Sequence, residues 1–300
     1  MIPHPFAYHR AATLEEASRL LGELGEEAKV LAGGQSLIPL MKLRLARPAA
    51  LIDLNHIPNT GYVERQNGHL RIGAMARHAA IEESSVASAI PLLHDCAAGI
   101  ADIQVRNMGT IGGSVAEADP HGDWAPVLLA LGAEVEAVGS AGARTIPVTK
   151  FITDAFTTVL APTELVKEIR VRVPAGRSAG AYIAFKRCAP VYPTASVAVQ
   201  VSMQDDDFCG AASVVLGCVG LTPVVATEAA AALAGQAITP HAIERAAEAA
   251  MNAADPQADL RGSVDYKRLL VRALARRAVL AALARARGEK VEVSHEYAGR

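Results

Sequence analysis

The sequence AGGQSLIP at residues 32–39 follows a short apolar run, residues 28–32, and leads into a segment with helical spacing. Gly33 and Gly34 carry no Cβ, so the consecutive backbone N–H groups from Gly33 to Ser36 are open to an anion such as a pyrophosphate. Ser36 also stands where it would cap the following helix, whose dipole favours negative charge. The alternative is an ordinary strand-to-helix turn, since the spacing matches neither the dinucleotide-binding motif nor the P-loop.

A second glycine-bearing segment, RNMGTIGGSVA, occupies residues 106–116. Thr110 can supply a hydroxyl, and Gly112 and Gly113 allow close backbone approach. We therefore expect a second phosphate-binding turn. Together, the two segments predict one diphosphate held between two loops.

Polar residues follow the second segment at short intervals: Glu117, Asp119, His121 and Asp123. Their alternation with small residues and Pro120 favours a loop that hydrogen-bonds a ribose, and a metal site is the alternative. Asp123 is placed to cap a short helix over residues 124–131.

The chain divides into three parts by pattern. Residues 1–55 read as a βαβ-like unit, with a capping box at Thr13–Glu16, a helix end at Gly25 and a strand at 50–54. Residues 56–176 mix antiparallel strands and helices, and they include a hairpin signal at 139–142 and a half-buried strand at 165–173. After a linker at 174–180, residues 177–300 form an α+β domain. Its expected strands are 181–186, 195–203 and 208–219, and its expected helices are 224–234, 240–254 and 263–287.

Composition limits the function. The chain has 300 residues and a net charge of −2, which argues against nucleic-acid binding. The charged share of 20% indicates either a surface covered by a partner or simply an alanine-rich helical composition. One basic amphipathic helix is expected at 267–287, with its basic side facing solvent or a partner.

Metal and membrane signals are weak. The cysteines, Cys96, Cys188, Cys209 and Cys218, are scattered without a metal-binding pair, so an iron–sulfur or zinc site of this chain's own is not expected. No long apolar run predicts export or membrane spanning, and a cytoplasmic location fits.

The two glycine segments, together with DPHGDWAP at 119–126, resemble the FAD-binding medium subunits of molybdenum hydroxylases. That family includes the flavoprotein subunit of aerobic carbon monoxide dehydrogenase and the FAD domain of xanthine dehydrogenase. The resemblance spans nearly the whole chain. It implies an α+β architecture, in which an FAD-binding fold of the vanillyl-alcohol-oxidase (PCMH) type with two subdomains precedes a C-terminal domain built on a three-stranded antiparallel sheet with helices.

The same resemblance implies cofactor-binding residues. On the first side of the pyrophosphate these are Ala32, Gly33, Gly34, Gln35, Ser36 and Leu37, and on the second side Thr110, Ile111, Gly112, Gly113 and Ser114. Asp119 and Asp123 fall near a ribose, Leu165 and Val166 against the isoalloxazine, and Lys186 and Tyr192 near the flavin ring. A cation at Lys186 would stabilise an anionic reduced flavin, whereas an exposed strand lysine is the alternative.

One departure from the family concerns residues 190–193. Members similar to carbon monoxide dehydrogenase have Gly-Asp-aromatic-Ala, whereas this chain has Pro190, Val191, Tyr192 and Pro193. The aromatic residue is kept, the acidic one is replaced by Val191, and two prolines stiffen the segment.

The implied function is that of an oxidoreductase subunit carrying FAD, with no catalytic side chain and no metal of its own. A large molybdenum-binding subunit with a molybdopterin-type cofactor and a small 2Fe–2S subunit are the expected partners, in a dimer of heterotrimers. Electrons would pass from the 2Fe–2S clusters to FAD and then to an external acceptor. The alternatives are a self-sufficient flavin oxidase or reductase of the same fold and a flavin-binding redox module without turnover.

Overall fold

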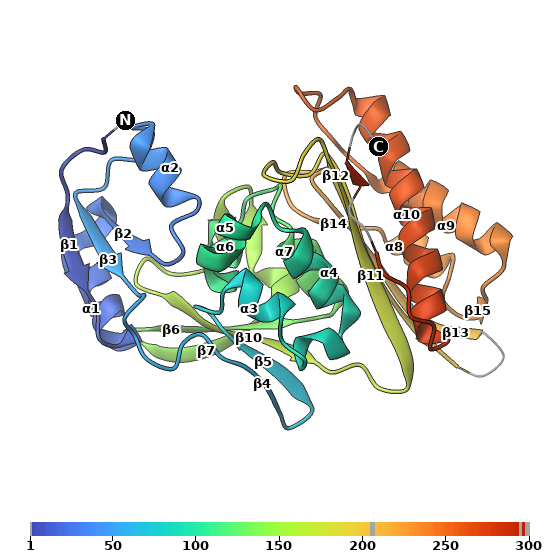
Figure 1. Cartoon of the computed structure of the whole chain (residues 1–300), viewed down its shortest axis with the longest axis horizontal. Coiled ribbons are helices and arrows are strands. Elements are labelled where there is room, and N and C mark those ends of the chain that lie inside the picture. The colour runs from blue at the N-terminus through green and yellow to red at the C-terminus, as the bar shows by residue number, and fades with distance from the viewer. Residues whose placement is uncertain (1, 205–207, 294–295, 298–300) are drawn as a thin grey trace.

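Three larger β-sheets follow one another along the chain in this computed structural model, which describes residues 2–204, 208–293 and 296–297, and a small sheet of two strands accompanies the second (Figure 1). The first sheet is parallel, in the order β1-β3-β2. Its strands are β1 (Ala7–Arg10), β2 (Ala28–Leu31) and β3 (Ala50–Asp53), with helix α1 (Leu14–Leu24) and the 3₁₀ turn η1 (Gly25–Glu27) between β1 and β2, and α2 (Leu37–Lys42) after β2.

The boundaries of α1 follow the sequence signals. The Thr13 hydroxyl accepts a hydrogen bond from the Glu16 N–H at 3.1 Å, and the Glu16 carboxylate accepts one from the Ala12 N–H at 2.7 Å. Gly25 ends the helix at a positive φ of 65°, which a glycine adopts without strain. The predicted Thr13 cap and Gly25 helix end are therefore confirmed, but the Glu16 carboxylate bonds Ala12 and not Thr13, so the capping box is incomplete.

The second sheet is antiparallel, in the order β4-β5-β10-β6-β7. Its strands are β4 (Val63–Gln66), β5 (His69–Gly73), β6 (Glu134–Gly139), β7 (Gly142–Pro147) and β10 (Leu165–Arg172). Gly139 pairs with Gly142, which confirms the predicted hairpin. Between β5 and β6 come α3 (His78–Glu82), η2 (Ala87–Ala89), α4 (Pro91–Gly99), α5 (Ile103–Met108), α6 (Ile111–Glu117) and α7 (Trp124–Ala130), and after β7 come η3 (Val148–Lys150), β8 (Ile152–Asp154) and β9 (Thr157–Thr158).

The helices α4 and α7 fill the space between the second and third sheets (Figure 1). Trp124 and Phe151 are fully buried there, in one core with residues of both sheets, including Ile169 of β10 and Tyr182 of the third sheet. Full burial of a large apolar side chain stabilises the folded state by about 2 kcal/mol or more. The second and third sheets thus share a hydrophobic core.

The third sheet has the order β14-β13-β12-β11-β16, with β15 also paired to β13. Its long strands are β11 (Arg177–Lys186), β12 (Ala195–Met203) and β13 (Phe208–Gly217), and its short ones are β14 (Val224–Val225), β15 (Gln236–Ala237) and β16 (Glu296–Tyr297). The three long antiparallel strands are those expected, and the short strands extend the sheet. The linker predicted at 174–180 is wrong beyond residue 176, because β11 begins at Arg177 and pairs along its length with β12.

Helices α8 (Thr227–Ala231), α9 (Pro240–Ala253) and α10 (Val264–Ala286) cover the other face of the third sheet (Figure 1). The predicted solvent-facing basic side of α10 is wrong at two positions. Lys267 is buried and pairs with Asp259 at 2.9 Å, and Arg285 turns inward to Asp95 of α4 at 2.6 Å. Five of the ten buried residues of α10 are alanines, whereas Leu269 and Leu280 of the same helix are exposed.

None of the helices in the described part of the chain is both long and apolar enough to cross a membrane.

Candidate functional site

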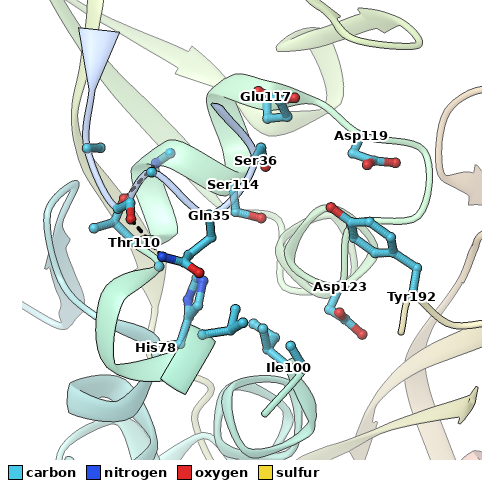
Figure 2. A pocket seen from close by; sticks show the side chains of 18 of the residues that line it. Gln35, Ser36, His78, Ile100, Thr110, Ser114, Glu117, Asp119, Asp123 and Tyr192 are labelled. Atoms are coloured by element: carbon cyan, nitrogen blue, oxygen red, sulfur yellow. Dashed lines mark hydrogen bonds between the residues drawn. The ribbon is translucent and has the colours of Figure 1, made fainter. Parts of the chain in front are cut away.

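A cavity of 260 Å³ opens where the β2–α2 connection, the helical stretch between β5 and β6, and the end of β11 with the loop after it meet (Figure 2). Most of the predicted cofactor residues line it. These are Ala32, Gly33, Gly34, Gln35, Ser36, Leu37, Thr110, Gly113, Ser114, Asp119, Asp123, Lys186 and Tyr192. Residues far apart in the sequence are thus brought to one place.

The first glycine segment has the chemistry expected of it. It joins the end of β2 to the start of α2, and Gly34 has a positive φ of 71°. Within the described residues, no protein group accepts a hydrogen bond from the backbone N–H of Gly33, Gly34, Gln35 or Ser36. The predicted capping of α2 by the Ser36 side chain is absent among these residues. Four adjacent amide donors therefore border the cavity and are available to an anion.

The second glycine segment differs from the predicted turn. Residues 111–117 form helix α6, and the Thr110 hydroxyl caps it by accepting from the Gly113 N–H at 3.2 Å. The N–H groups of Ile111 and Gly112 donate to the carbonyls of Ala76 and Ala74, at 3.1 and 2.9 Å. The expectation of free amides is therefore wrong for Ile111, Gly112 and Gly113.

The close backbone approach that Gly112 allows is to Ala74 of the protein itself and not to a ligand. A Cβ there would lie 2.5 Å from the Cβ of Ala74, and neither Gly112 nor Ile111 lines the cavity. Gly33 also packs on the protein, because a Cβ at that position would lie 2.4 Å from the carbonyl oxygen of Met108. The two glycine segments are in direct contact with each other.

Two polar side chains that do not line the cavity, Asn55 and Arg77, stabilise the contact between the two glycine segments. The Asn55 amide nitrogen donates to the Ala32 carbonyl at 2.9 Å, while its side-chain oxygen accepts from Arg77 at 2.6 Å. Arg77 in turn donates to the Met108 carbonyl. Asn55 is therefore bonded to the first segment and Arg77 to the second, and no sequence pattern indicates either residue.

The polar loop after α6 forms one wall of the cavity. Burial raises the pKa of the Asp119 carboxyl, but hydrogen bonds from His121 and Tyr192 outweigh it and leave that pKa below its usual value. Burial raises the pKa of Glu117, and the neighbouring Asp119 raises it further. Burial also raises the pKa of Tyr192, whose hydroxyl is hydrogen-bonded to Asp119 and Ser36. Tyr192 thus connects the loop after β11 to the first glycine segment.

The metal alternative for this loop finds no support in its geometry. Nowhere in residues 2–204, 208–293 and 296–297 do three or more histidine, cysteine, aspartate or glutamate side chains gather as metal ligands.

Lys186 and Asp123 form a buried pair at the cavity. Lys186 is 1% exposed, so it is not the exposed strand lysine that the alternative required. Its ammonium donates to the Gly99 carbonyl and lies 3.9 Å from an oxygen of Asp123. Asp123 precedes α7 as expected but makes no side-chain cap there, because its carboxylate accepts from the Tyr182 hydroxyl at 2.7 Å.

Leu165 and Val166 lie away from the cavity. Both are buried in β10, Leu165 in the core beneath the first sheet and Val166 in the core of the second. Neither is among the residues that line the cavity.

An apolar wall and one polar residue of the cavity were not expected from the sequence. Ile100, Ala101 and Val105, at the α4–α5 junction, line the cavity, as does the buried His78 of α3. Isolated residues of these types carry no signal in a single sequence, because only the fold brings them to the glycine segments.

Comparisons with known proteins match nearly the whole chain to one protein family. Residues 4–175 match the family of the FAD binding domain in molybdopterin dehydrogenase, and residues 180–282 match that of the CO dehydrogenase flavoprotein C-terminal domain. The chain is 39% identical over 288 residues to the carbon monoxide dehydrogenase medium chain of Afipia carboxidovorans, covering 96% of this chain and 100% of that one. It is 36% identical over 297 residues to the 6-hydroxypseudooxynicotine dehydrogenase complex subunit alpha of Paenarthrobacter nicotinovorans, covering 98% and 100%.

A solved structure gives the same assignment. A carbon monoxide dehydrogenase from Hydrogenophaga pseudoflava that lacks the Mo-pyranopterin moiety of its cofactor superposes with a TM-score of 0.92 at 40% identity, covering 95% of this chain and 99% of that one. The PCMH-type FAD-binding fold and the C-terminal antiparallel sheet implied by the sequence are thereby confirmed. The chain belongs to the FAD-binding medium subunits of the molybdenum hydroxylases, a family of oxidoreductases.

Proposed function

We propose that this chain carries the oxidative half-reaction of a molybdenum hydroxylase complex. In this proposal, electrons leave an organic or gaseous substrate at a large molybdenum-binding subunit and pass through the 2Fe–2S clusters of a small subunit to FAD on this chain. FAD supplies the redox chemistry and passes the electrons to an external acceptor. The complex is a dimer of heterotrimers, located in the cytoplasm.

The observation that carries the proposal is the row of four amide donors at one side of the cavity. The diphosphate of FAD is anionic, and successive backbone N–H groups are a suitable binding surface for it. The cavity lies near the lower limit of small-molecule sites, so a cofactor as long as FAD extends beyond it. The residues present therefore fit the diphosphate and the groups next to it.

The two glycine segments have unequal roles in this proposal. Gly33, Gly34, Gln35 and Ser36 provide the amide donors, with Ala32 and Leu37 beside them. The second segment provides a wall through Thr110, Gly113 and Ser114. Ile111 and Gly112 hold that wall to the stretch just after β5, through the carbonyls of Ala76 and Ala74. Asp119 and Asp123 offer acceptors to the ribose hydroxyl groups.

The apolar part of the cavity lining suits the flavin ring. Ile100, Ala101 and Val105 give it an apolar surface, and Lys186 places a positive charge near it. Asp123 offsets part of that charge at 3.9 Å. A cation at this point favours the negatively charged reduced form of a flavin over the neutral oxidised form. Leu165 and Val166 do not line the cavity, and they support the flavin site only through the buried cores to which they belong.

Substrate choice belongs to another chain in this proposal. Relatives named for carbon monoxide and for 6-hydroxypseudooxynicotine are similar to this chain at 39% and 36% identity, each over at least 96% of its length. A subunit that contacts the substrate would be expected to separate such relatives more strongly. We therefore assign substrate recognition to the large subunit.

The test is purification of the tagged chain from its native host. We expect two further chains to copurify, with molybdenum, iron and one FAD for each copy of this chain, and with FAD bleached when the substrate of the complex is added without an acceptor. A single flavoprotein that turns over a substrate alone would establish the oxidase or reductase alternative. A flavoprotein whose FAD no substrate of the complex reduces would establish the redox-module alternative.

A further inference from the structure

His78 borders the cavity but has no place in the function proposed above. It is the first residue of α3, only 4% exposed, and its backbone N–H donates to the Gly109 carbonyl at 3.2 Å. A Cβ at Gly109 would lie 2.7 Å from His78 Nε2. The imidazole is therefore held beside the second glycine segment, in space left by a missing side chain.

Trp124 determines which ring nitrogen of His78 carries the hydrogen. The indole nitrogen of Trp124 lies 3.1 Å from His78 Nδ1, in a buried contact. An indole N–H only donates, so Nδ1 must accept and carries no hydrogen. In the neutral imidazole the hydrogen is then on Nε2.

The surroundings also keep the ring neutral. Burial lowers the pKa of His78 to about 4, and the positive charges of Arg77 and Arg106 lower it in the same direction. At neutral pH, Nε2 is therefore an N–H donor without a net charge.

The Nε2 donor makes no hydrogen bond within the described part of the chain. None of the described residues, from 2 to 204, 208 to 293 and 296 to 297, accepts a hydrogen bond from Nε2, although the ring lines the cavity. Nε2 is not one of the fully buried polar atoms that lack a partner, so it is open to the cavity, and an acceptor on a ligand there can take its hydrogen bond.

Nε2 lies close to the free amides of the first segment. Gly109 is the neighbour common to both, because a Cβ at Gly33 would lie 2.6 Å from the Gly109 Cα. Figure 2 shows His78 on the same side of the cavity as Gln35 and Thr110, away from Glu117 and Asp119. The nearest ligand group is therefore the one that these amides bind.

We propose that His78 is a cofactor-binding residue whose Nε2–H donates to a phosphoryl oxygen of the FAD diphosphate, with Trp124 as the positioning residue that fixes its tautomer. The proposal rests on the function proposed above and adds a side-chain donor to the four backbone donors. Because the donor is neutral, it binds the phosphoryl oxygen without adding a charge that would have to be buried in the empty site.

Two variants of similar size separate the donor from the packing. His78→Leu removes both ring nitrogens, whereas His78→Gln keeps an N–H donor near the place of Nε2. Leucine leaves the Trp124 indole without an acceptor, whereas the amide oxygen of glutamine can still accept from it. Thermal unfolding of both variants therefore measures any difference in the fold, and the difference in affinity that remains reports on the Nε2 donor.

Binding of FAD and of ADP is measured in the full chain, or in the complex if partners copurify. ADP carries the diphosphate without the flavin. We expect His78→Leu to weaken both ligands by the same factor, about 10- to 100-fold for a hydrogen bond to a charged group, and His78→Gln to recover most of the loss. Nitrogen NMR of the wild-type chain should show Nε2 protonated and Nδ1 unprotonated from pH 6 to 8.

Three results would overturn the proposal: equal binding by both variants and the wild type, weaker FAD binding with ADP unchanged, or a ring protonated at Nδ1. Failure of the wild-type chain and complex to bind FAD at all would instead overturn the proposed function. The two failures are thus distinct.

Discussion

Arg77 donates a 2.6 Å hydrogen bond to the side-chain oxygen of Asn55, and this pair joins the two glycine segments behind the cavity. Neither residue lines the cavity, so their effect on a ligand is exerted through the positions of Ala32 and Met108.

We expect Arg77→Met to release the second segment from the first and to weaken FAD binding by about 10-fold, as for the loss of its two hydrogen bonds to Met108 and Asn55. Binding is measured by titration of the cofactor-free chain or complex. Arg144→Met is the matched control, because it removes the Arg144–Glu164 ion pair, which lies outside the cavity. Equal loss of affinity in both variants would show that the effect is a general one of lost arginine contacts.

His78 also predicts a pH dependence of stability. Its pKa is about 4 in the folded chain, against the ordinary histidine value of 6.5 that applies to the unfolded chain, so the unfolded state binds more protons between these values. The stabilisation is fully present above pH 6.5 and is lost as the pH falls towards 4, by up to about 3–4 kcal/mol for this difference in pKa.

Urea unfolding at pH 7 and at pH 5 measures this dependence. His78→Gln should reduce the difference in the free energy of unfolding between the two pH values, because glutamine does not titrate. An unchanged difference would mean that other groups account for the acid sensitivity.

Substitution of Gly112 should change the stability of the fold and should not remove a contact with a ligand. Gly112→Ala places a Cβ 2.5 Å from Ala74, so we expect the free energy of unfolding to fall by about 1–3 kcal/mol, as in other overpacked sites. Gly22→Ala within α1 is the control, since its Cβ would meet only a methyl group at 3.4 Å and alanine favours a helix by about 0.5–1 kcal/mol. Denaturant unfolding without FAD should show opposite signs for the two variants.

The buried pair of Asp95 and Arg285 ties α4 to α10. Arg285 donates to both carboxylate oxygens, at 2.6 and 2.9 Å, and to the Gly180 carbonyl at 2.8 Å. We expect Arg285→Met to lower the free energy of unfolding by about 3–5 kcal/mol, because it leaves a buried carboxylate without its counter-charge.

A double-mutant cycle checks this interpretation. Replacing Asp95 by Asn together with Arg285→Met should cost less than the sum of the two single changes. Additive losses would mean that the two charges do not interact.

The features predicted well from the sequence depend on local signals. The Thr13 cap, the Gly25 helix end and the Gly139–Gly142 hairpin each need only a few neighbouring residues to form. The free amides of the first glycine segment are predictable for the same reason, since a strand end and a helix start leave its donors without partners.

The features predicted poorly depend on distant partners. The donors of Ile111 and Gly112 are used by Ala76 and Ala74, about 35 residues earlier in the chain, and Arg285 meets Asp95 across 190 positions. The spacing of apolar residues in the sequence cannot show that α10 packs closely through alanines. Leu269 and Leu280 of this helix are therefore exposed to solvent in the fold. His78 was missed because only the folded chain brings it to Gly109.

The cavity takes one of its walls, Lys186 and residues 190–192, from the end of β11 and the loop after it, far downstream of both glycine segments. During synthesis, residues 1–175 therefore leave the ribosome before that wall exists. The full set of lining residues is present only after translation has passed residue 192. A chain cut short near residue 175 would retain every glycine of both segments and still lack one side of the site.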